Sequence, residues 1–178
     1  MPAAENIVLQ YLTQMRALRA TGATTAETSF YPAISALFNQ VGANLKPVVI
    51  FTTQLTGDSH PDGGFFPVLK NSKTTGPILT QRPERGAVEI KPLGQSLVTL
   101  AQTSQVRGYI DEYGLVLLTN YHQFLLARLS ASGSVETFDG YDLTKVKLID
   151  RKALLQALLA TFVTPSSAIQ FSDGIGGD

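Results

Sequence analysis

Residues 88–91 read Val-Glu-Ile-Lys, and Pro92 follows them. The β-branched side chains at 88 and 90 predict a short strand, which the proline ends. A helical pattern with Gly114 beyond its last residue spans residues 96–113, and the apolar run 115–119 predicts another strand. A strand, a helix and a second strand therefore follow one another in this part of the chain.

The same kind of pattern extends to both sides of this unit. Apolar residues at three- and four-residue spacing predict helices, and β-branched or aromatic runs predict strands. The expected elements are helices at residues 5–20, 30–41 and 150–162, and strands at residues 46–53, 65–69 and 124–129. This order predicts an α/β fold, with a central mixed sheet flanked by helices.

Length and composition restrict the class of protein. A chain of 178 residues is expected to form one domain. We assign it residues 1–163 and interpret the Ser-, Gly- and Asp-rich residues 164–178 as a flexible tail or linker. No apolar stretch approaches the roughly 18 residues of a membrane span, so no membrane partner is expected. The absence of cysteine excludes disulfides and thiolate metal sites. A cytoplasmic location is the simplest interpretation, since no secretory signal begins the sequence.

Charge is balanced overall and uneven locally. The 14 basic and 14 acidic residues give a net charge of zero, which argues against tight nucleic-acid binding by this chain alone. Residues 70–85 form a basic segment, however, in which Glu84 is the only acidic residue. We expect its four cations to contact DNA: Lys70, Lys73, Arg82 and Arg85.

The strand at 88–91 carries the first candidate for chemistry. Alternate side chains of a strand share a face, so Glu89 and Lys91 are predicted to be neighbours. An acid-x-Lys triplet is weak evidence, because about one arises by chance in a chain of this size. Asp150-Arg151-Lys152 is a second example, and there we expect Asp150 to be the N-cap of a helix.

Two further features distinguish Glu89 and Lys91 from that second triplet. Asp62 lies upstream in Pro61-Asp62-Gly63-Gly64, where the glycines let the backbone bend around an ion. Downstream, Gln105 and Tyr109 are one helical turn apart and share a face. Phosphodiester hydrolysis with Mg²⁺ requires hard oxygen ligands and a cation near the attacking water.

We therefore expect the two carboxylates and one main-chain carbonyl to bind the metal. The predicted ligands are Asp62, Glu89 and the carbonyl oxygen of Ile90. Lys91 is expected to position the water or help to deprotonate it, and to offset charge on the phosphate.

Five segments in a fixed order resemble a known family. They are Glu27-Thr28-Ser29-Phe30-Tyr31-Pro32, Pro61-Asp62-Gly63-Gly64, Glu89-Ile90-Lys91, Gln105-Val106-Arg107-Gly108-Tyr109 and Leu115-Val116-Leu117-Leu118-Thr119-Asn120-Tyr121. They look like the N-terminal PD-(D/E)xK endonuclease domain of restriction-modification proteins. In that family the nuclease precedes an adenine-specific DNA methyltransferase and a target-recognition region.

The resemblance implies a restriction-endonuclease-like core and a role for each candidate residue of the site. Asp62 and Glu89 would bind Mg²⁺, with Mn²⁺ as a substitute, and Lys91 would be the catalytic lysine. Glu27 would be an additional acid, and Gln105 would support the site from its helix. The implied partners are double-stranded DNA and the methyltransferase and target-recognition domains. Double-strand cleavage needs two such sites, so we also expect transient pairing on DNA.

Each feature also has an ordinary structural interpretation. Asp62 could simply form a turn, and Glu89 with Lys91 could be a solvated surface pair. His60 and His122 are predicted to be surface residues, since neither has a partner spaced for a metal site. Two alternative functions follow: an inactive nuclease-like docking or DNA-channel module, and a structural domain in which the motifs coincide by chance.

Overall fold

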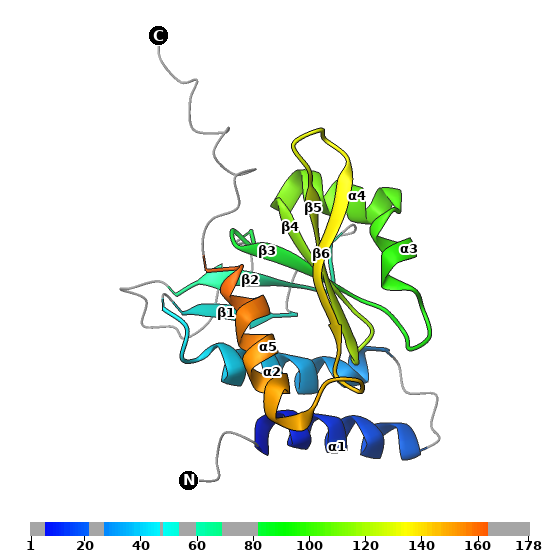
Figure 1. Ribbon diagram of the computed structural model, residues 1–178, viewed down its shortest axis with the longest axis vertical. Helices are drawn as coiled ribbons and strands as arrows, with labels where there is room; N and C mark the ends of the chain where they lie inside the picture. Colours follow the sequence, from blue (N-terminus) through cyan, green and yellow to red (C-terminus); the bar gives the residue numbers. More distant parts are fainter. Residues whose placement is uncertain (1–5, 22–26, 47, 54–59, 69–81, 164–178) are drawn as a thin grey trace.

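Six strands form one sheet in which the spatial order follows the sequence, β1-β2-β3-β4-β5-β6 (Figure 1). The structure is a computed structural model that describes residues 6–21, 27–46, 48–53, 60–68 and 82–163. The strands are β1 (Val49–Thr52), β2 (Gly63–Pro67), β3 (Gly86–Ile90), β4 (Leu115–Thr119), β5 (Gln123–Leu129) and β6 (Val135–Asp142).

Five α-helices and one short 3₁₀ helix accompany the sheet within the described residues. They are α1 (Asn6–Ala20), the 3₁₀ helix η1 (Glu27–Phe30), α2 (Tyr31–Gly42), α3 (Leu97–Ala101), α4 (Ser104–Tyr113) and α5 (Leu148–Ala160). Strands β3 and β4 run parallel and are joined through α3 and α4, whereas every other neighbouring pair is antiparallel. The prediction of a mixed α/β sheet flanked by helices is confirmed.

The sheet separates two cores, and the alternation along β3 shows how. Val88 and Ile90 are fully buried in the larger core, which contains side chains of α1, α2 and α5. Ala87 packs on the other face with α3 and α4. Glu89 alternates with Val88 and Ile90, so it belongs to the face that α3 and α4 cover.

Aromatic packing holds α2 against the larger core. Phe38 on α2 contacts the rings of Phe51, Phe65 and Phe124 at centroid distances of 5.0, 5.8 and 5.9 Å. These rings come from β1, β2 and β5, so one helical side chain connects three strands. Tilted and edge-to-face ring pairs of this kind add about 1 kcal/mol each to the area that they bury.

Three sequence predictions about helices were wrong in detail. The single helix expected at residues 96–113 is two helices, because the Thr103 side chain accepts from the Val106 N–H and starts α4. Helix α2 ends at Gly42, one residue after the expected end. The N-cap of α5 is Lys147, and Asp150 lies in the first turn instead.

The edges of the sheet are β1 and β6, and β6 was not predicted. It pairs antiparallel with β5 along its length, with a register shift between Phe124 and Leu126. The described part of the chain contains no helix with the length and apolar character needed to cross a membrane.

Candidate functional site

Asp62 connects three elements at the point where β2 begins and β3 ends. It immediately precedes β2, and continuing the β2–β3 register places it opposite Glu89. The Tyr31 hydroxyl on α2 donates to Asp62 Oδ1 at 2.6 Å, and the Ile90 N–H donates to Asp62 Oδ2 at 2.7 Å. Both carboxylate oxygens are therefore oriented by donors from fixed elements.

Glu89 and Lys91 form a close ion pair next to Asp62. Lys91 Nζ lies 2.6 Å from Glu89 Oε1, and the exposed fractions of the two side chains are 24% for the lysine and 3% for the glutamate. Burial and the Asp62 charge raise the pKa of Glu89 and Lys91 opposes them, so that together they bring it to about 7. A carboxyl that gains and loses its proton near neutral pH is suited to a site that binds a cation.

Helix α4 adds two polar side chains to this cluster. Gln105 Nε2 donates to the Tyr109 hydroxyl at 3.1 Å. Burial raises the pKa of Tyr109, and the charges of Glu89 and Asp62 raise it further. Tyr109 therefore lies within the electrostatic field of the carboxylates.

The structure brings together four of the five predicted catalytic residues: Asp62, Glu89, Lys91 and, through Tyr109, Gln105. Glu27 begins the 3₁₀ helix η1, one turn before Tyr31, but its side chain lies outside the described residues. Ile90 contributes its backbone at the site, while its side chain is fully buried in the larger core.

The predicted DNA-contacting residues are located elsewhere. Lys70 and Lys73 lie outside the described residues. Arg82 and Arg85 precede β3, so they lie at the opposite end of that strand from Glu89, on the order of 15 Å away. Arg82 donates to the backbone carbonyl of Glu112 and lies over the Tyr113 ring, 5.3 Å from its centroid. These contacts attach the start of β3 to the end of α4.

The donor set fits a hard divalent cation only in part. Asp62 and Glu89 provide two adjacent carboxylates, and main-chain carbonyl oxygen is a usual third ligand for Mg²⁺ or Ca²⁺. Among the described residues, no group of three or more His, Cys, Asp or Glu side chains gathers at one point. A complete oxygen shell would thus need water or further residues besides these two carboxylates.

Sequence reasoning missed Tyr31. The residue stands in one of the segments that carry the resemblance, yet no role was given to it. Its contact with Asp62 joins residues 31 positions apart, so local periodicity does not reveal it. Its position one turn after Glu27 is the only signal that the sequence offers.

His60 is exposed, as expected, but His122 differs from the prediction. It is half-buried in the turn between β4 and β5, and its Nε2 lies 3.1 Å from Arg19 Nη1 on α1. Burial lowers the pKa of His122, and the positive charge of Arg19 lowers it further.

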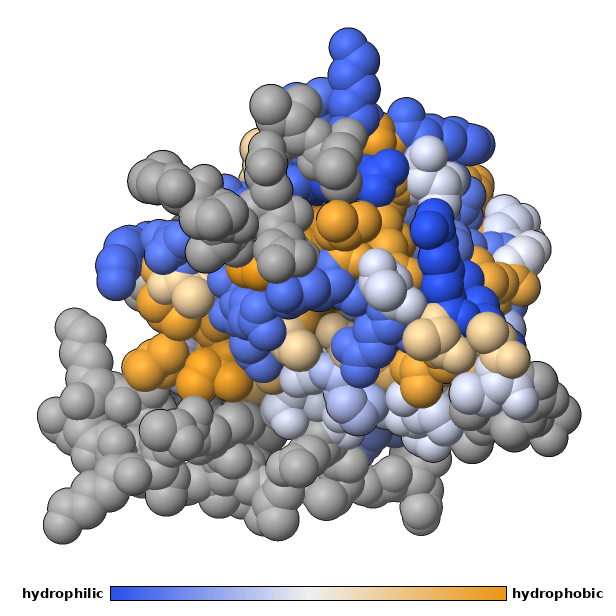
Figure 2. All heavy atoms as spheres, turned by 90° about the horizontal axis from the view of Figure 1, so that it is seen from below, coloured by the Kyte–Doolittle hydropathy of each residue, from blue (hydrophilic) through white to orange (hydrophobic). Residues whose placement is uncertain are grey.

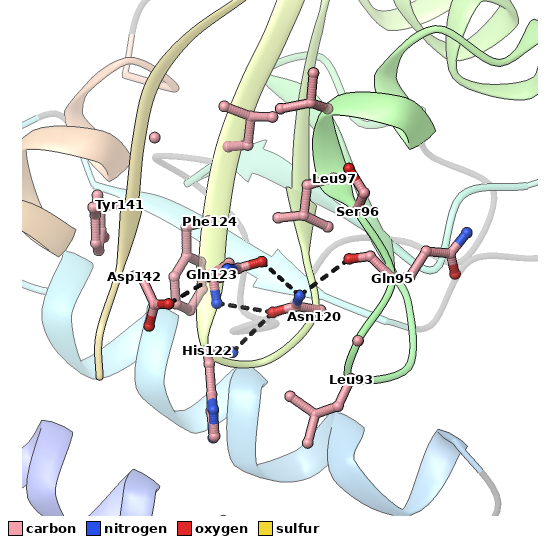
Figure 3. Close-up of a pocket in the computed structure, with 14 residues that line it drawn as sticks. Leu93, Gln95, Ser96, Leu97, Asn120, His122, Gln123, Phe124, Tyr141 and Asp142 are labelled. Carbon is pink, nitrogen blue, oxygen red and sulfur yellow. Dashed lines mark hydrogen bonds between the residues drawn. The ribbon is translucent and has the colours of Figure 1, made fainter. Parts of the chain in front are cut away.

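An open groove of about 690 Å³ lies beyond the end of β4 (Figure 3). Asn120 occupies its middle, where its amide donates to Gln95 O at 3.3 Å and Gln123 Oε1 at 2.8 Å. The Asn120 oxygen accepts from the backbone N–H groups of His122 and Gln123. Because these polar groups satisfy one another, the groove offers few of them to a ligand and is not the candidate catalytic site.

The chain matches no protein-family model, no curated protein and no solved structure.

Proposed function

We propose that this chain is a metal-dependent endonuclease domain with a PD-(D/E)xK core, hydrolysing the phosphodiester backbone of double-stranded DNA. One observation carries the proposal. Asp62 immediately precedes β2 and accepts a hydrogen bond from the Ile90 N–H at the end of β3. Beside it, Glu89 forms an ion pair with Lys91. Two carboxylates and a lysine that gather at the end of β3 are the groups that this reaction needs.

Each side chain has a role that its surroundings support. Asp62 is held in one orientation by its two donors, so it is preorganised to bind a cation. Glu89 is buried and has a pKa of about 7, so it can bind a cation once its proton leaves. Lys91 retains partial exposure, which lets its ammonium group approach a water molecule and a phosphate.

Asp62, Glu89 and the Ile90 carbonyl would hold Mg²⁺ or Mn²⁺, which supplies Lewis-acid stabilisation of the phosphate charge when bound. Gln105 would support the site through its bond with Tyr109. Fusion to a methyltransferase and a target-recognition region, transient pairing on DNA and a cytoplasmic location belong to the same proposal.

The test is a pair of substitutions assayed for cleavage and for metal binding. Lys91→Ala is expected to abolish plasmid cleavage in Mg²⁺ and to leave folding and Mn²⁺ binding nearly unchanged at a pH well above the pKa of Glu89. Asp62→Ala is expected to abolish cleavage and Mn²⁺ binding together. Lys152→Ala, on α5, removes the same charge away from the ends of β2 and β3 and serves as the control.

One observation favours a second candidate, an inactive nuclease-like docking module. The oxygens of Asp62 accept internal hydrogen bonds, and Glu89 is paired with Lys91. A closed network of this kind can also stabilise a fold without chemistry. Absence of Mg²⁺- or Mn²⁺-dependent change in thermal stability, together with equal cleavage by Lys91→Ala and the parent, would decide for the docking module.

A further inference from the structure

The end of α1 meets the turn between β4 and β5 through one polar contact. Arg19 Nη1 lies 3.1 Å from His122 Nε2. A guanidinium group has no acceptor atom, so it is the donor and the imidazole nitrogen accepts. The positive charge of Arg19 is thus held in place by a neutral ring.

This contact leaves Arg19 without a negatively charged partner among the described residues. Its Nη2 atom is buried and has no hydrogen-bond acceptor within that part of the chain. Helix α1 also carries Arg16, which acts on the same imidazole, and it contains no acidic residue. The nearby carboxylate Asp142 already accepts from Thr144 and lies 3.8 Å from Lys145.

A buried donor without an acceptor costs about 1–3 kcal/mol, so its presence requires a reason. An oxygen anion bound at this point would remove the cost and neutralise part of the charge. Guanidinium groups bind phosphate through two parallel hydrogen bonds, which matches a group that already has one nitrogen fixed.

The position of Arg19 relates this feature to the candidate active site. Strands β3 and β4 are parallel neighbours, with Ile90 opposite Thr119 and the Lys91 N–H donating to Thr119 O at 2.9 Å. The turn that holds His122 therefore begins beside the end of β3. In Figure 1 the C-terminal end of α1 and the start of α2 lie on this same side of the molecule.

A series of contacts joins Asp62, in the candidate active site, to Arg19. Tyr31 binds Asp62, and the preceding residue Phe30 packs on the Tyr121 ring at 5.1 Å. Tyr121 is the neighbour of His122, which holds Arg19. Helix α1 packs on the face of the larger core, whereas Glu89 lies on the face that α3 and α4 cover. With layers about 10 Å apart and strands about 4.8 Å apart, the two places are on the order of 15 Å from each other, which corresponds to a few nucleotides.

We propose that Arg19, fixed by His122 and assisted by Arg16, binds a backbone phosphate of DNA within a few nucleotides of the phosphodiester at Glu89 and Lys91. The proposal rests on the nuclease function as far as the ligand is DNA. It assigns the DNA path to the side of the molecule on which α1, β3 and β4 end. Figure 2 views the molecule from the side on which α1 lies, where hydrophilic side chains are interspersed with apolar ones.

The experiment is a binding titration of a labelled duplex over a series of salt concentrations. Ca²⁺ replaces Mg²⁺, and a gel checks that the duplex stays intact. The variants are Arg19→Gln and Arg16→Gln, the latter at an exposed position where folding is not at risk. The control is Arg128→Gln, which removes the same charge at the opposite end of β4, where Arg128 pairs with Leu115.

We expect the slope of log K against log salt to fall by about 0.9 for each phosphate that is no longer neutralised, or about eightfold weaker binding at 0.1 M salt. Arg19→Gln should show the full effect, Arg16→Gln a smaller one, and Arg128→Gln none. Equal slopes for all three variants would overturn the proposal, as would a parent that binds no duplex at low salt.

The result is separable from the test of nuclease function. If the parent binds DNA and Arg19→Gln weakens binding, the phosphate position stands even where no cleavage occurs. If the parent cuts DNA and Arg19→Gln binds like Arg128→Gln, the nuclease proposal stands and this one falls.

A final arm adds inorganic phosphate at constant ionic strength. Stabilisation of the parent by phosphate, with unchanged DNA binding by Arg19→Gln, would identify a free-phosphate site and overturn the DNA proposal.

Discussion

Glu89 is buried beside one like charge and one opposite charge, and this makes its protonation depend on its neighbours. Burial and Asp62 favour the neutral carboxyl, while Lys91 favours the carboxylate. A divalent cation would act in the same direction as Lys91 and far more strongly. We therefore expect metal binding to release a proton from Glu89 at neutral pH.

This protonation makes stability depend on pH. The folded pKa of about 7 lies above the ordinary value of 4.5, so the folded state holds more protons between these values. Stability without metal must therefore fall as pH rises from about 4.5 to 7, by up to about 3 kcal/mol. Glu89→Gln should abolish most of this fall, because the amide does not titrate.

Urea unfolding at a pH near 5 and at a pH near 8, with EDTA present, measures the effect. Glu136→Gln is the control, since Glu136 forms an exposed surface pair with Arg128. A parent that is equally stable at both pH values would contradict the assigned environment of Glu89.

Tyr31 provides a second test at the residue scale. Tyr31→Phe removes the donor to Asp62 Oδ1, and hydrogen bonds to charged groups contribute about 1.5–3 kcal/mol. We expect the free energy of unfolding to fall by about 1–2 kcal/mol and Mn²⁺ binding to weaken, because one carboxylate oxygen loses its orientation. Urea unfolding and calorimetry measure the two effects.

Tyr141→Phe is the matched control for this change. The Tyr141 hydroxyl is buried and has no hydrogen-bond partner among the described residues. Its removal should leave stability unchanged or raise it, since an unsatisfied donor is lost. If both variants behave alike, Tyr31 does not position Asp62.

The residues of the site were partly predictable. Strand alternation predicted that Glu89 and Lys91 are neighbours, and their 2.6 Å contact agrees with this. The approach of Asp62 to the same strand came from the order of motifs, not from spacing. Tyr31 was missed because its bond depends on how α2 packs on the sheet, which no local pattern encodes.

At the scale of elements, the errors have physical causes. Thr103 interrupts an apolar helical pattern because its hydroxyl provides an N-cap, and that local bond outweighs continuous periodicity. Strand β6 contains Asp139 with a positive φ of 44° and Gly140, both typical of turns. It is a strand because β5 offers a partner, and such pairing is not visible in β6 alone.

The edge strand β1 is protected by one side chain of α2. Asn39 donates through Nδ2 to Phe51 O at 2.9 Å, and its Oδ1 accepts from the Phe51 N–H at 2.9 Å. The outward backbone N–H and carbonyl of Phe51, which would otherwise be free at a sheet edge, are therefore satisfied from a helix.

Asn39→Ala should lower stability by about 2 kcal/mol, because it removes two hydrogen bonds of about 1 kcal/mol each. It should also increase association between molecules, since the edge of β1 becomes available for pairing. Urea unfolding and light scattering measure these effects. Gln40→Ala, at the exposed next position, should change stability by less than about 0.5 kcal/mol. Equal behaviour of the two variants would remove Asn39 from this role.

Considered as a whole molecule, the chain has candidate catalytic groups at the end of β3 but little charge with which to hold DNA. Its net charge is zero, and Arg82 is engaged with α4. Arg19 and Arg16 add one phosphate position in our proposal. The number of neutralised phosphates is therefore small, whereas sequence-specific proteins make many such contacts and typically bind at about 10⁻⁸–10⁻¹¹ M.

We therefore expect these 178 residues alone to bind DNA weakly, with a dissociation constant of about 10⁻⁵ M or weaker and no sequence preference. Cleavage should be slow or absent, because the phosphodiester seldom occupies the site. Fusion to a DNA-recognising domain should raise the local concentration of DNA and direct cutting near that domain's target.

The measurement is a titration at about 150 mM salt, where charges are screened beyond roughly 8 Å, with duplexes of unrelated sequence compared. A fusion carrying Lys91→Ala controls for cleavage by contaminants. Tight and sequence-specific binding by the unfused chain would show that the recognition surface lies within these residues. The expectation that another domain recognises the DNA would then be wrong.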